Sequence, residues 1–223
     1  TDGDADRIGI IDENGRFMTT QEVFALLAMY FLDIRKERGP LVKTLTSTDM
    51  LFAIGEIYNV PVFETPVGFK YVAPIMIREK ALLGGEESGG YGFRGHIPER
   101  DGMLAGLYFI DYIVRTGKSP SQLLANLFKK VGPHYYDRLD IHTTDEIKQQ
   151  MLAKMSAAPA AKIGGQKVVK LDTRDGFRYK LEDGSWLLLR FSGTEPLVRI
   201  YAECDSMEEV KKLIQYGQEM VGV

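Results

Sequence analysis

The sequence predicts an α/β protein organised in three consecutive regions, residues 1–39, 40–133 and 134–223. In the second region, short apolar runs alternate with segments of helical spacing, which is the order of layered α/β folds. In the third region, three or four short apolar runs follow one another between two helical segments, which is typical of an α+β domain. Gly39-Pro40 and Gly132-Pro133 separate the regions, because neither dipeptide continues a helix.

The first region predicts a hairpin followed by a helix. Residues 8–11 and 16–18 are short apolar segments, and Asn14-Gly15 between them is a tight-turn dipeptide. Thr19 and Glu22 form a capping-box pattern. The helix that follows carries apolar residues at helical spacing and is expected to stop at Gly39-Pro40; these residues are Val23, Leu27, Tyr30 and Ile34.

The second region predicts strands at 41–45, 60–63 and 82–83. Helices are expected through Met50 and Ile54, over 75–80 with Pro74 near the helix start, from about Asp101 to Arg115, and from Ser119-Pro120. The glycine-rich stretch 84–100 is interpreted as a long loop.

The third region predicts a strand at 135–142, a helix at 145–156 and a linker at 157–165. Further strands are expected at 167–173, 176–181, 186–191 and 198–203. A last helix begins at Ser206, with Glu209 as its capping partner.

Composition limits the function classes. The chain has 28 basic and 31 acidic residues, a net charge of -3, so bulk electrostatic binding of nucleic acid is not expected. The single Cys204 excludes a disulfide framework and a thiolate metal cluster, and fits a reducing compartment. No apolar run approaches the ~20 residues of a membrane span. We therefore expect a cytoplasmic protein with neither nucleic-acid nor membrane partners.

The chain begins with the motif Asp2-Gly3-Asp4-Ala5-Asp6-Arg7, which suggests a piece of something longer. Three carboxylates at alternate positions of a tight loop can converge on Mg²⁺ or Ca²⁺. A helix-loop-helix calcium site is one alternative, with Glu13 in the place of its last ligand, but Arg7 stands where that loop needs Gly. A solvated acidic turn is another. An arginine beside a cation site also suggests a bound anion such as a phosphoryl group.

Two further segments contain glycine next to candidate site residues. In Thr65-Pro66-Val67-Gly68-Phe69-Lys70, Gly68 permits a sharp bend and Lys70 could be a charged group held by a rigid loop, although a plain surface lysine is the alternative. Gly84-Gly85-Glu86-Glu87-Ser88-Gly89-Gly90 projects carboxylates and a hydroxyl, which suit vicinal sugar hydroxyls, unless it is a solvent loop.

A fourth motif is suited to phosphate. Arg190-Phe191-Ser192-Gly193-Thr194-Glu195-Pro196-Leu197-Val198-Arg199 sets two guanidinium groups around a Ser-Gly-Thr turn. A phosphate dianion needs charged donors together with hydroxyl and backbone N–H groups. A β-turn with two surface arginines is the alternative.

These motifs occur in the same order in the α-D-phosphohexomutases, the phosphoglucomutase/phosphomannomutase family, which the sequence resembles over its whole length. Asp-Gly-Asp-Ala-Asp-Arg resembles the metal-binding loop, Gly-Glu-Glu-Ser-Gly the sugar-binding loop, and Arg-Phe-Ser-Gly-Thr-Glu-Pro the phosphate-binding loop. The resemblance implies four domains. Residues 1–39 would end the second, 40–133 would form a complete α/β third domain with a mixed sheet, and 134–223 would be the C-terminal α+β domain.

The resemblance also implies roles for the residues. A phosphoserine in a missing N-terminal domain would phosphorylate a hexose phosphate, giving a bisphosphorylated sugar that returns its other phosphoryl group, so this chain alone would be inactive. Arg7 and Lys70 would be catalytic, with Lys43 and His96 as weaker acid/base candidates. Mg²⁺ would be bound by Asp2, Asp4 and Asp6. Substrate contacts would come from Glu86, Ser88, His96, Arg100, Arg190, Ser192, Gly193, Thr194 and Arg199.

The Glu-Glu-Ser sequence of this loop favours glucose phosphates as the substrates, with mannose phosphates next. The third and fourth motifs are expected to face one cavity and hold opposite ends of a single sugar phosphate. Two alternatives remain open at this point: a non-catalytic calcium- or sugar-phosphate-binding module, and a degenerate family member with a regulatory role.

Overall fold

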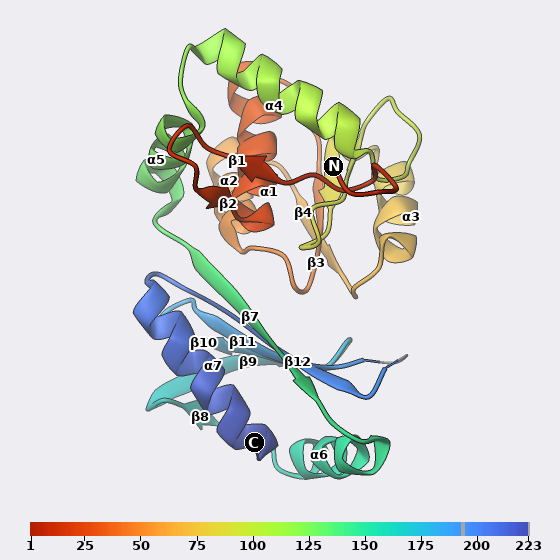
Figure 1. The fold of residues 1–223 in the computed structure, drawn as a ribbon, viewed down its shortest axis with the longest axis vertical. Coiled ribbons are helices and arrows are strands. Elements are labelled where there is room, and N and C mark those ends of the chain that lie inside the picture. The colour runs from red at the N-terminus through yellow and green to blue at the C-terminus, as the bar shows by residue number, and fades with distance from the viewer. Residues whose placement is uncertain (193–194, 223) are drawn as a thin grey trace. The chain divides into compact units, whose positions relative to one another are not determined.

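The computed structural model describes residues 1–192 and 195–222. The chain divides into two compact units, Thr1–Gly132 and Pro133–Val223, and each is described by itself (Figure 1). Within the described residues, every helix is too short or too polar to cross a membrane. The assignment of residues 1–39 to the end of a separate domain stays a prediction.

The first unit opens with the predicted hairpin. Strands β1 (Ile10–Ile11) and β2 (Phe17–Met18) pair antiparallel. The Asp12 carboxylate accepts hydrogen bonds from the backbone N–H groups of Asn14 and Arg16, both at 2.9 Å, and so closes the turn. Gly15 in that turn has φ +81°, a backbone conformation that favours glycine.

The predicted capping box and helix follow. Helix α1 (Thr20–Met29) is capped by Thr19, whose hydroxyl accepts from the Glu22 N–H while the Glu22 carboxylate accepts from the Thr19 N–H. The helix continues as one π-helical segment, η1 (Tyr30–Ile34), and ends before Gly39-Pro40. Nearly every side chain of α1 is buried, so α1 is a core helix of this unit.

A four-stranded mixed sheet forms the centre of the first unit. Its strands are β3 (Leu41–Thr44), β4 (Val62–Thr65), β5 (Leu83–Gly85) and β6 (Tyr91–Phe93), in the order β4-β3-β5-β6. Strand β3 is parallel to β4 and β5, and β6 is antiparallel to β5. Helix α3 (Phe69–Glu79) packs its own apolar cluster against the sheet, and α2 (Met50–Tyr58) belongs to the main core with α1.

Helices α4 (Gly102–Thr116) and α5 (Pro120–Val131) complete this unit and pack on α1. The α/β class is confirmed, with two local errors. Helix α3 begins at Phe69, so Pro74 lies inside it and not near its start. The glycine-rich stretch contains strand β6 and is not one long loop.

The second unit is an antiparallel sheet with two helices, which confirms the α+β prediction. Its strands are β7 (Tyr135–His142), β8 (Lys162–Ile163), β9 (Gln166–Asp172), β10 (Phe177–Leu181), β11 (Trp186–Phe191) and β12 (Leu197–Cys204). They lie in the order β7-β12-β11-β10-β9-β8, and β8 occupies part of the predicted linker.

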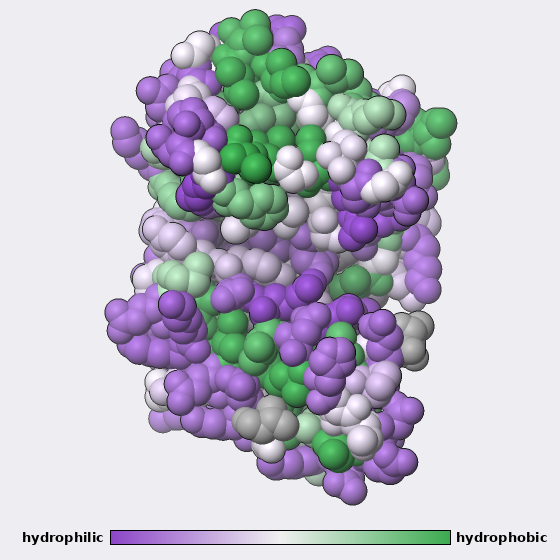
Figure 2. Space-filling model, viewed as in Figure 1, coloured by the Kyte–Doolittle hydropathy of each residue, from purple (hydrophilic) through white to green (hydrophobic). Residues whose placement is uncertain are grey.

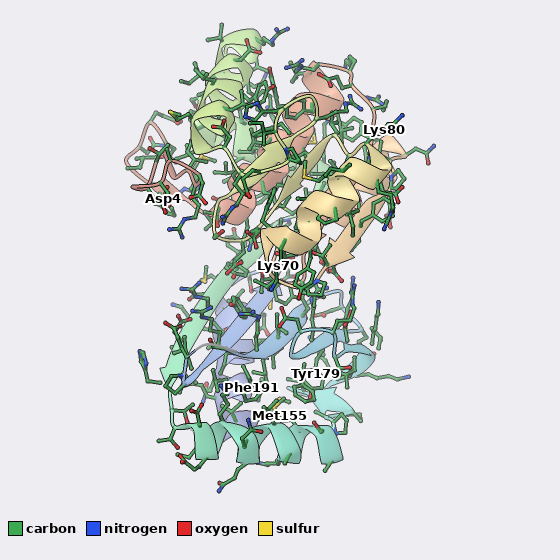
Figure 3. All side chains as sticks on the ribbon, turned by 90° about the vertical axis from the view of Figure 1, so that its right-hand side faces the viewer. Asp4, Lys70, Lys80, Met155, Tyr179 and Phe191 are labelled. Carbon is green, nitrogen blue, oxygen red and sulfur yellow. The ribbon has the colours of Figure 1, made fainter. Side chains whose placement is uncertain are left out.

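One face of this sheet is covered by α6 (Asp145–Ala157) and α7 (Met207–Val221), which share a single apolar core. Met155 of α6 points toward Tyr179 and Phe191 of the sheet (Figure 3). Ser206 caps α7, and its hydroxyl accepts a hydrogen bond from the Glu209 N–H, as the sequence predicted.

Candidate functional site

The aspartate motif at the start of the chain forms a tight loop held by its own arginine. The Arg7 Nε donates to the Asp2 carboxylate at 2.7 Å, and the Ala5 N–H donates to the Asp2 carbonyl at 3.3 Å. The hydrogen bond from Arg7 lowers the pKa of the Asp2 carboxyl, although burial opposes this. The loop therefore keeps Asp2 ionised.

This loop is docked on both sides. On one side the Gly102 N–H, at the start of α4, donates to the Ala5 carbonyl at 2.9 Å. A Cβ on Gly102 would lie 2.6 Å from the Arg7 carbonyl oxygen, so only glycine permits this approach. On the other side Arg7 forms an antiparallel bridge with Gly90, and the Ile8 N–H donates to the Gly89 carbonyl. The aspartate loop and the Glu-Glu-Ser loop therefore lie side by side.

The aspartate side chains are suited to a hard cation by donor type but are not gathered as a metal group. Among the described residues, no cluster of three or more His, Cys, Asp or Glu side chains could hold a metal ion. Asp2 faces Arg7, and Asp6 forms an ion pair with Arg100 at 2.9 Å. In this arrangement the two carboxylates face arginines and are not gathered around a common point.

Glu13 argues against the calcium-loop alternative. Its carboxylate accepts hydrogen bonds from the Ser119 hydroxyl at 2.6 Å and from the hydroxyl and N–H of Ser121, at the start of α5. These bonds lower the pKa of Glu13 to about 2. The residues around the loop form strands β1 and β2, whereas that class of site needs helices. The calcium-module alternative therefore has no structural support.

The Glu-Glu-Ser loop joins β5 to β6 and buries its first carboxylate. Glu86 is 5% exposed, and its N–H donates to the Gly90 carbonyl at 3.0 Å. Burial raises the pKa of the Glu86 carboxyl, while the charge of Arg100 acts in the opposite direction. Glu87 is held by Thr46, whose hydroxyl donates to its carboxylate at 3.0 Å, and by Thr20, whose hydroxyl donates to its carbonyl.

Arg100 connects the two loops. One of its terminal nitrogens lies 2.9 Å from Asp6 and the other lies 3.5 Å from Glu86. Its guanidinium carbon lies 5.8 Å from the centre of the Phe69 ring. Arg100 thus contacts both the aspartate loop and the Glu-Glu-Ser loop, so the two loops lie close enough for one bound molecule to reach both.

Ser88 is exposed and lines a hollow of about 450 Å³ together with Asp2, Arg7 and Thr20. The hydroxyl therefore faces the same space as part of the aspartate loop. Of the predicted metal and sugar residues, Asp2 and Ser88 line this hollow, whereas Asp4, Asp6 and Glu86 do not.

Lys70 and His96 do not line this hollow, although Phe69, the neighbour of Lys70, packs against Arg100. Lys70 is an exposed residue in the first turn of α3, with its ammonium group 5.1 Å from the Tyr71 ring centre, and Figure 3 shows it apart from Asp4. The rigid loop predicted around Lys70 is thus a helix start. His96 is exposed, lies 3.0 Å from the Asp101 carboxylate, and lines a different hollow with Ile77.

Lys43 is fully buried. Its ammonium group lies 2.7 Å from Asp49 and 3.2 Å from Glu64, and 4.6 Å from the centre of the Phe52 ring. Because two carboxylates surround its ammonium group, we interpret Lys43 as part of a structural ion-pair cluster.

In the second unit, Arg190 of β11 and Arg199 of β12 are direct cross-strand partners. Like charges at such positions repel, so each needs a carboxylate. Asp175 lies 3.1 Å from Arg190, and Asp140 lies 3.5 Å from Arg199. Two guanidinium groups on one sheet face, next to one loop, form a strong anion-binding arrangement.

The loop between these strands is held by its own backbone and by a lysine. The Ser192 N–H donates to the Leu197 carbonyl at 2.9 Å, and the Glu195 N–H donates to the Ser192 hydroxyl at 3.2 Å. Lys148 of α6 donates to the Ser192 carbonyl at 2.7 Å and reaches the Glu195 carbonyl at 3.5 Å. The predicted residues Gly193 and Thr194 lie outside the described residues.

Lys148 was missed by the sequence reasoning, because nothing in a helical lysine signals a contact with a loop 44 residues away. Gly102 was missed as well, although its place directly after Arg100-Asp101 could have suggested a close backbone approach.

Two family models match the chain. One, described as phosphoglucomutase/phosphomannomutase, alpha/beta/alpha domain III, matches residues 19–131. The other, described as the C-terminal domain of phosphoglucomutase/phosphomannomutase, matches residues 143–216.

Individual relatives agree with these matches. A phosphoglucomutase/phosphomannomutase of Thermococcus kodakarensis is 33% identical over 99% of this chain and 46% of its own length. A probable phosphoglucosamine mutase of Methanopyrus kandleri is 32% identical over 95% of this chain and 44% of its own. The solved putative phosphomannomutase of Thermus thermophilus is 34% identical, with a TM-score of 0.83 over 100% of this chain and 45% of that one. The chain thus spans just under half the length of these relatives.

Proposed function

We propose that this chain, which belongs to the phosphoglucomutase/phosphomannomutase family, is part of an enzyme that interconverts hexose 1-phosphates and hexose 6-phosphates. In this proposal glucose phosphates are the preferred substrates and mannose phosphates come next, because the sugar loop has the sequence Glu86-Glu87-Ser88. The relatives include phosphoglucosamine mutases, so glucosamine phosphate is the competing substrate to test.

The observation that carries the proposal is the Arg100 bridge. It joins Asp6 of the aspartate loop to Glu86 of the sugar loop, at distances of 2.9 and 3.5 Å. A sugar whose hydroxyls contact Glu86 and Ser88 would have a reacting oxygen next to Arg7 and Arg100. Positive charge at that point stabilises the negative charge that develops on a transferred phosphoryl group.

The second unit would hold the phosphate that does not react. Arg190 and Arg199 would supply charged donors, and the loop from Ser192 through Gly193 and Thr194 would supply hydroxyl and backbone N–H groups. Binding energy from this distant contact orients the reacting end of the sugar.

Mg²⁺ is proposed as the cofactor of the complete enzyme, with Asp2, Asp4 and Asp6 as ligands. All three are oxygen donors of the kind that Mg²⁺ prefers. The ion would have to separate Asp2 from Arg7 and Asp6 from Arg100, because both carboxylates now face arginines. Binding of Mg²⁺ should therefore be weak in this chain and tighter once a phosphoryl group completes the site.

Proton transfer is proposed for Lys70, with His96 as a further candidate for contact with the sugar. Both are exposed in the first unit, so the burial that favours a neutral lysine base would have to come from the rest of the enzyme. In the complete enzyme, a phosphoserine from the preceding domains would donate its phosphoryl group to the sugar, and the bisphosphorylated sugar would return the other one. This chain alone would be inactive.

Calorimetry with glucose 1-phosphate tests the binding part of the proposal. We expect weak, saturable binding that is lost in Arg190→Ala and Arg199→Ala and reduced in Glu86→Gln. Arg78→Ala is the matched control, because Arg78 is an exposed arginine of α3 that forms an ion pair with its neighbour Glu79. Binding that survives both Arg190→Ala and Arg199→Ala would refute the proposed phosphate site.

Turnover tests the remaining part. The complete protein is expected to interconvert the 1- and 6-phosphates of glucose with a higher kcat/KM than those of mannose or glucosamine, and to need Mg²⁺. The 223-residue chain is expected to show no turnover, even with glucose 1,6-bisphosphate added. We also propose a cytoplasmic location, on the single buried cysteine, which fits a reducing compartment.

A further inference from the structure

Helix α4 has two apolar faces, and only one of them packs inside the unit. Ala105, Phe109 and Tyr112 are buried in the main core. The outward face carries four large apolar side chains that are 58–72% exposed and recur at intervals of four, three and four residues: Met103, Leu107, Ile110 and Val114. That spacing places them along one side of the helix.

The β1–β2 hairpin extends this outward face. Ile11 is 67% exposed and Phe17 is 57% exposed. An added Cβ on Gly106 would lie 3.0 Å from Ile8 Cδ1, so the segment leading into β1 runs against α4. Figure 2 shows apolar side chains gathered over α4 and over the hairpin. We call these six residues, Ile11, Phe17, Met103, Leu107, Ile110 and Val114, the α4–hairpin face.

Isolated exposed apolar side chains are common on proteins, but six large ones on adjoining elements are not. Monomeric proteins rarely expose a continuous apolar patch larger than a few hundred Å². Each of the six is more than half exposed, and all of them lie on α4 or on the hairpin next to it. The two charged residues of α4, Asp111 and Arg115, form an ion pair with each other. Such a face is suited to an apolar protein surface.

The candidate occupant is the part of the complete protein that precedes this chain. The family models that match are domain III and the C-terminal domain, and the relatives are about twice as long, so further domains stand before domain III in them. Thr1 and Asp2 line the same hollow as Ile11 and Phe17. The first residues of the chain therefore lie beside the hairpin part of the α4–hairpin face.

We propose that the α4–hairpin face is the surface on which the preceding domains pack in the complete protein. This inference rests on the proposed function only in taking the chain as part of a longer mutase. Because the Gly102 N–H at the start of α4 holds the Ala5 carbonyl of the aspartate loop, packing on α4 also fixes the preceding domains relative to that loop. The face would thus set where a phosphoryl donor meets the Asp2–Arg7 segment.

Thiol labelling tests this directly, because Cys204 is buried and is the single cysteine of the chain. Leu107→Cys places a thiol in the middle of the face, and Ile77→Cys places one on α3, where Ile77 is 63% exposed, similar to Leu107 at 64%. Both variants are treated with iodoacetamide, in the 223-residue chain and in the complete protein, and labelling at each position is followed by mass spectrometry.

We expect equal labelling rates at both positions in the 223-residue chain. In the complete protein, position 107 should label at least tenfold more slowly, while position 77 should keep its rate. Equal rates at position 107 in both proteins would overturn the proposal. Protection of position 107 that grows with the concentration of the 223-residue chain would also overturn it, since the occupant would be a second copy.

Turnover of hexose phosphates by the complete protein is measured separately. A complete protein that protects position 107 but lacks mutase activity would support the interface and refute the proposed function.

Discussion

Lys43 offers the sharpest stability test in the first unit. Its side chain is fully buried and lies between the carboxylates of Asp49 and Glu64, which are 7% and 10% exposed. Replacing Lys43 with Met preserves much of the volume of the side chain but removes its charge. Two buried carboxylates then remain without their cation.

The magnitude follows from the burial. Removing one partner of a buried ion pair destabilises a protein by about 3–5 kcal/mol, because the remaining charge stays desolvated. With a urea dependence of about 2 kcal/mol per M, the midpoint of unfolding should fall by about 1.5–2.5 M. The same exchange at Lys36, whose side chain is 72% exposed and paired with Asp33 at 3.4 Å, should cost less than about 1 kcal/mol.

The assay can separate the two units. Trp186 is the single tryptophan and lies in the second unit, so its fluorescence follows that unit, while circular dichroism also follows the helices of the first. Lys43→Met should shift the first unit's transition in circular dichroism and leave the transition in Trp186 fluorescence unchanged. If Lys43→Met lowers the midpoint no more than Lys36→Met does, the buried ion pair does not stabilise the unit as argued.

Three further predictions concern the loops. Lys148→Met should weaken glucose 1-phosphate binding about tenfold in calorimetry, because the loop at Ser192 loses the charged donor to the Ser192 carbonyl. The control is Lys154→Met, since Lys154 is an exposed lysine of the same helix, and this variant should keep the affinity. Equal affinities of the two variants would contradict the prediction. Glu13→Gln should make stability depend less on acid. The pKa of Glu13 is lowered from 4.5 to about 2, so the stability that its carboxylate contributes is full above pH 4.5 and is lost as the pH falls toward 2. Urea midpoints of the variant and the unchanged protein should therefore converge as the pH falls, and parallel curves would argue against this. Gly102→Ala should lower the free energy of unfolding by about 1–3 kcal/mol and speed amide exchange at Ile8, because the new Cβ would meet the Arg7 carbonyl. In the control Gly3→Ala the new Cβ meets no atom within 4 Å, so exchange should not change. An unaltered exchange rate at Ile8 in Gly102→Ala would refute the docking of the aspartate loop on α4.

Local signals in the sequence predicted most of the fold. The predicted capping residues Thr19 and Ser206 each sit at the start of a helix in the structure, because the hydroxyl that caps a helix lies within three residues of its partner. The strands of the second unit were likewise predicted from local signals, the short apolar runs that follow one another in the chain. Such features depend on neighbours in the chain.

Two glycine and proline signals were misinterpreted, for a physical reason. Pro74 lies inside α3 at an exposed position, so the carbonyl that it leaves without a helical donor can face water. Gly84 and Gly85 belong to strand β5, where an added Cβ would collide with Met76 and Phe24 respectively. These glycines serve close packing, whereas the sequence reasoning interpreted them as loop residues.

The site was predictable in its parts and not in its connections. The four motifs were visible as residue patterns, but the contact of Arg100 with Asp6 joins positions 94 apart, and the choice of partner depends on the completed fold. The same holds for the charge on Arg199, which is balanced by Asp140 from strand β7. Patterns identify the chemistry, and packing decides which groups meet.

The facing pair Arg190 and Arg199 has a consequence for how a ligand would be released. Asp175 and Asp140 act as internal counter-ions, so an incoming phosphate competes with carboxylates that belong to the protein itself. A dianion competes better than a monoanion, and a phosphate monoester loses its second charge below a pH of about 6. If a sugar phosphate is bound here as proposed, mild acidification would therefore weaken its binding, and the arginines would pair again with their aspartates, with no large cost in stability for the empty site.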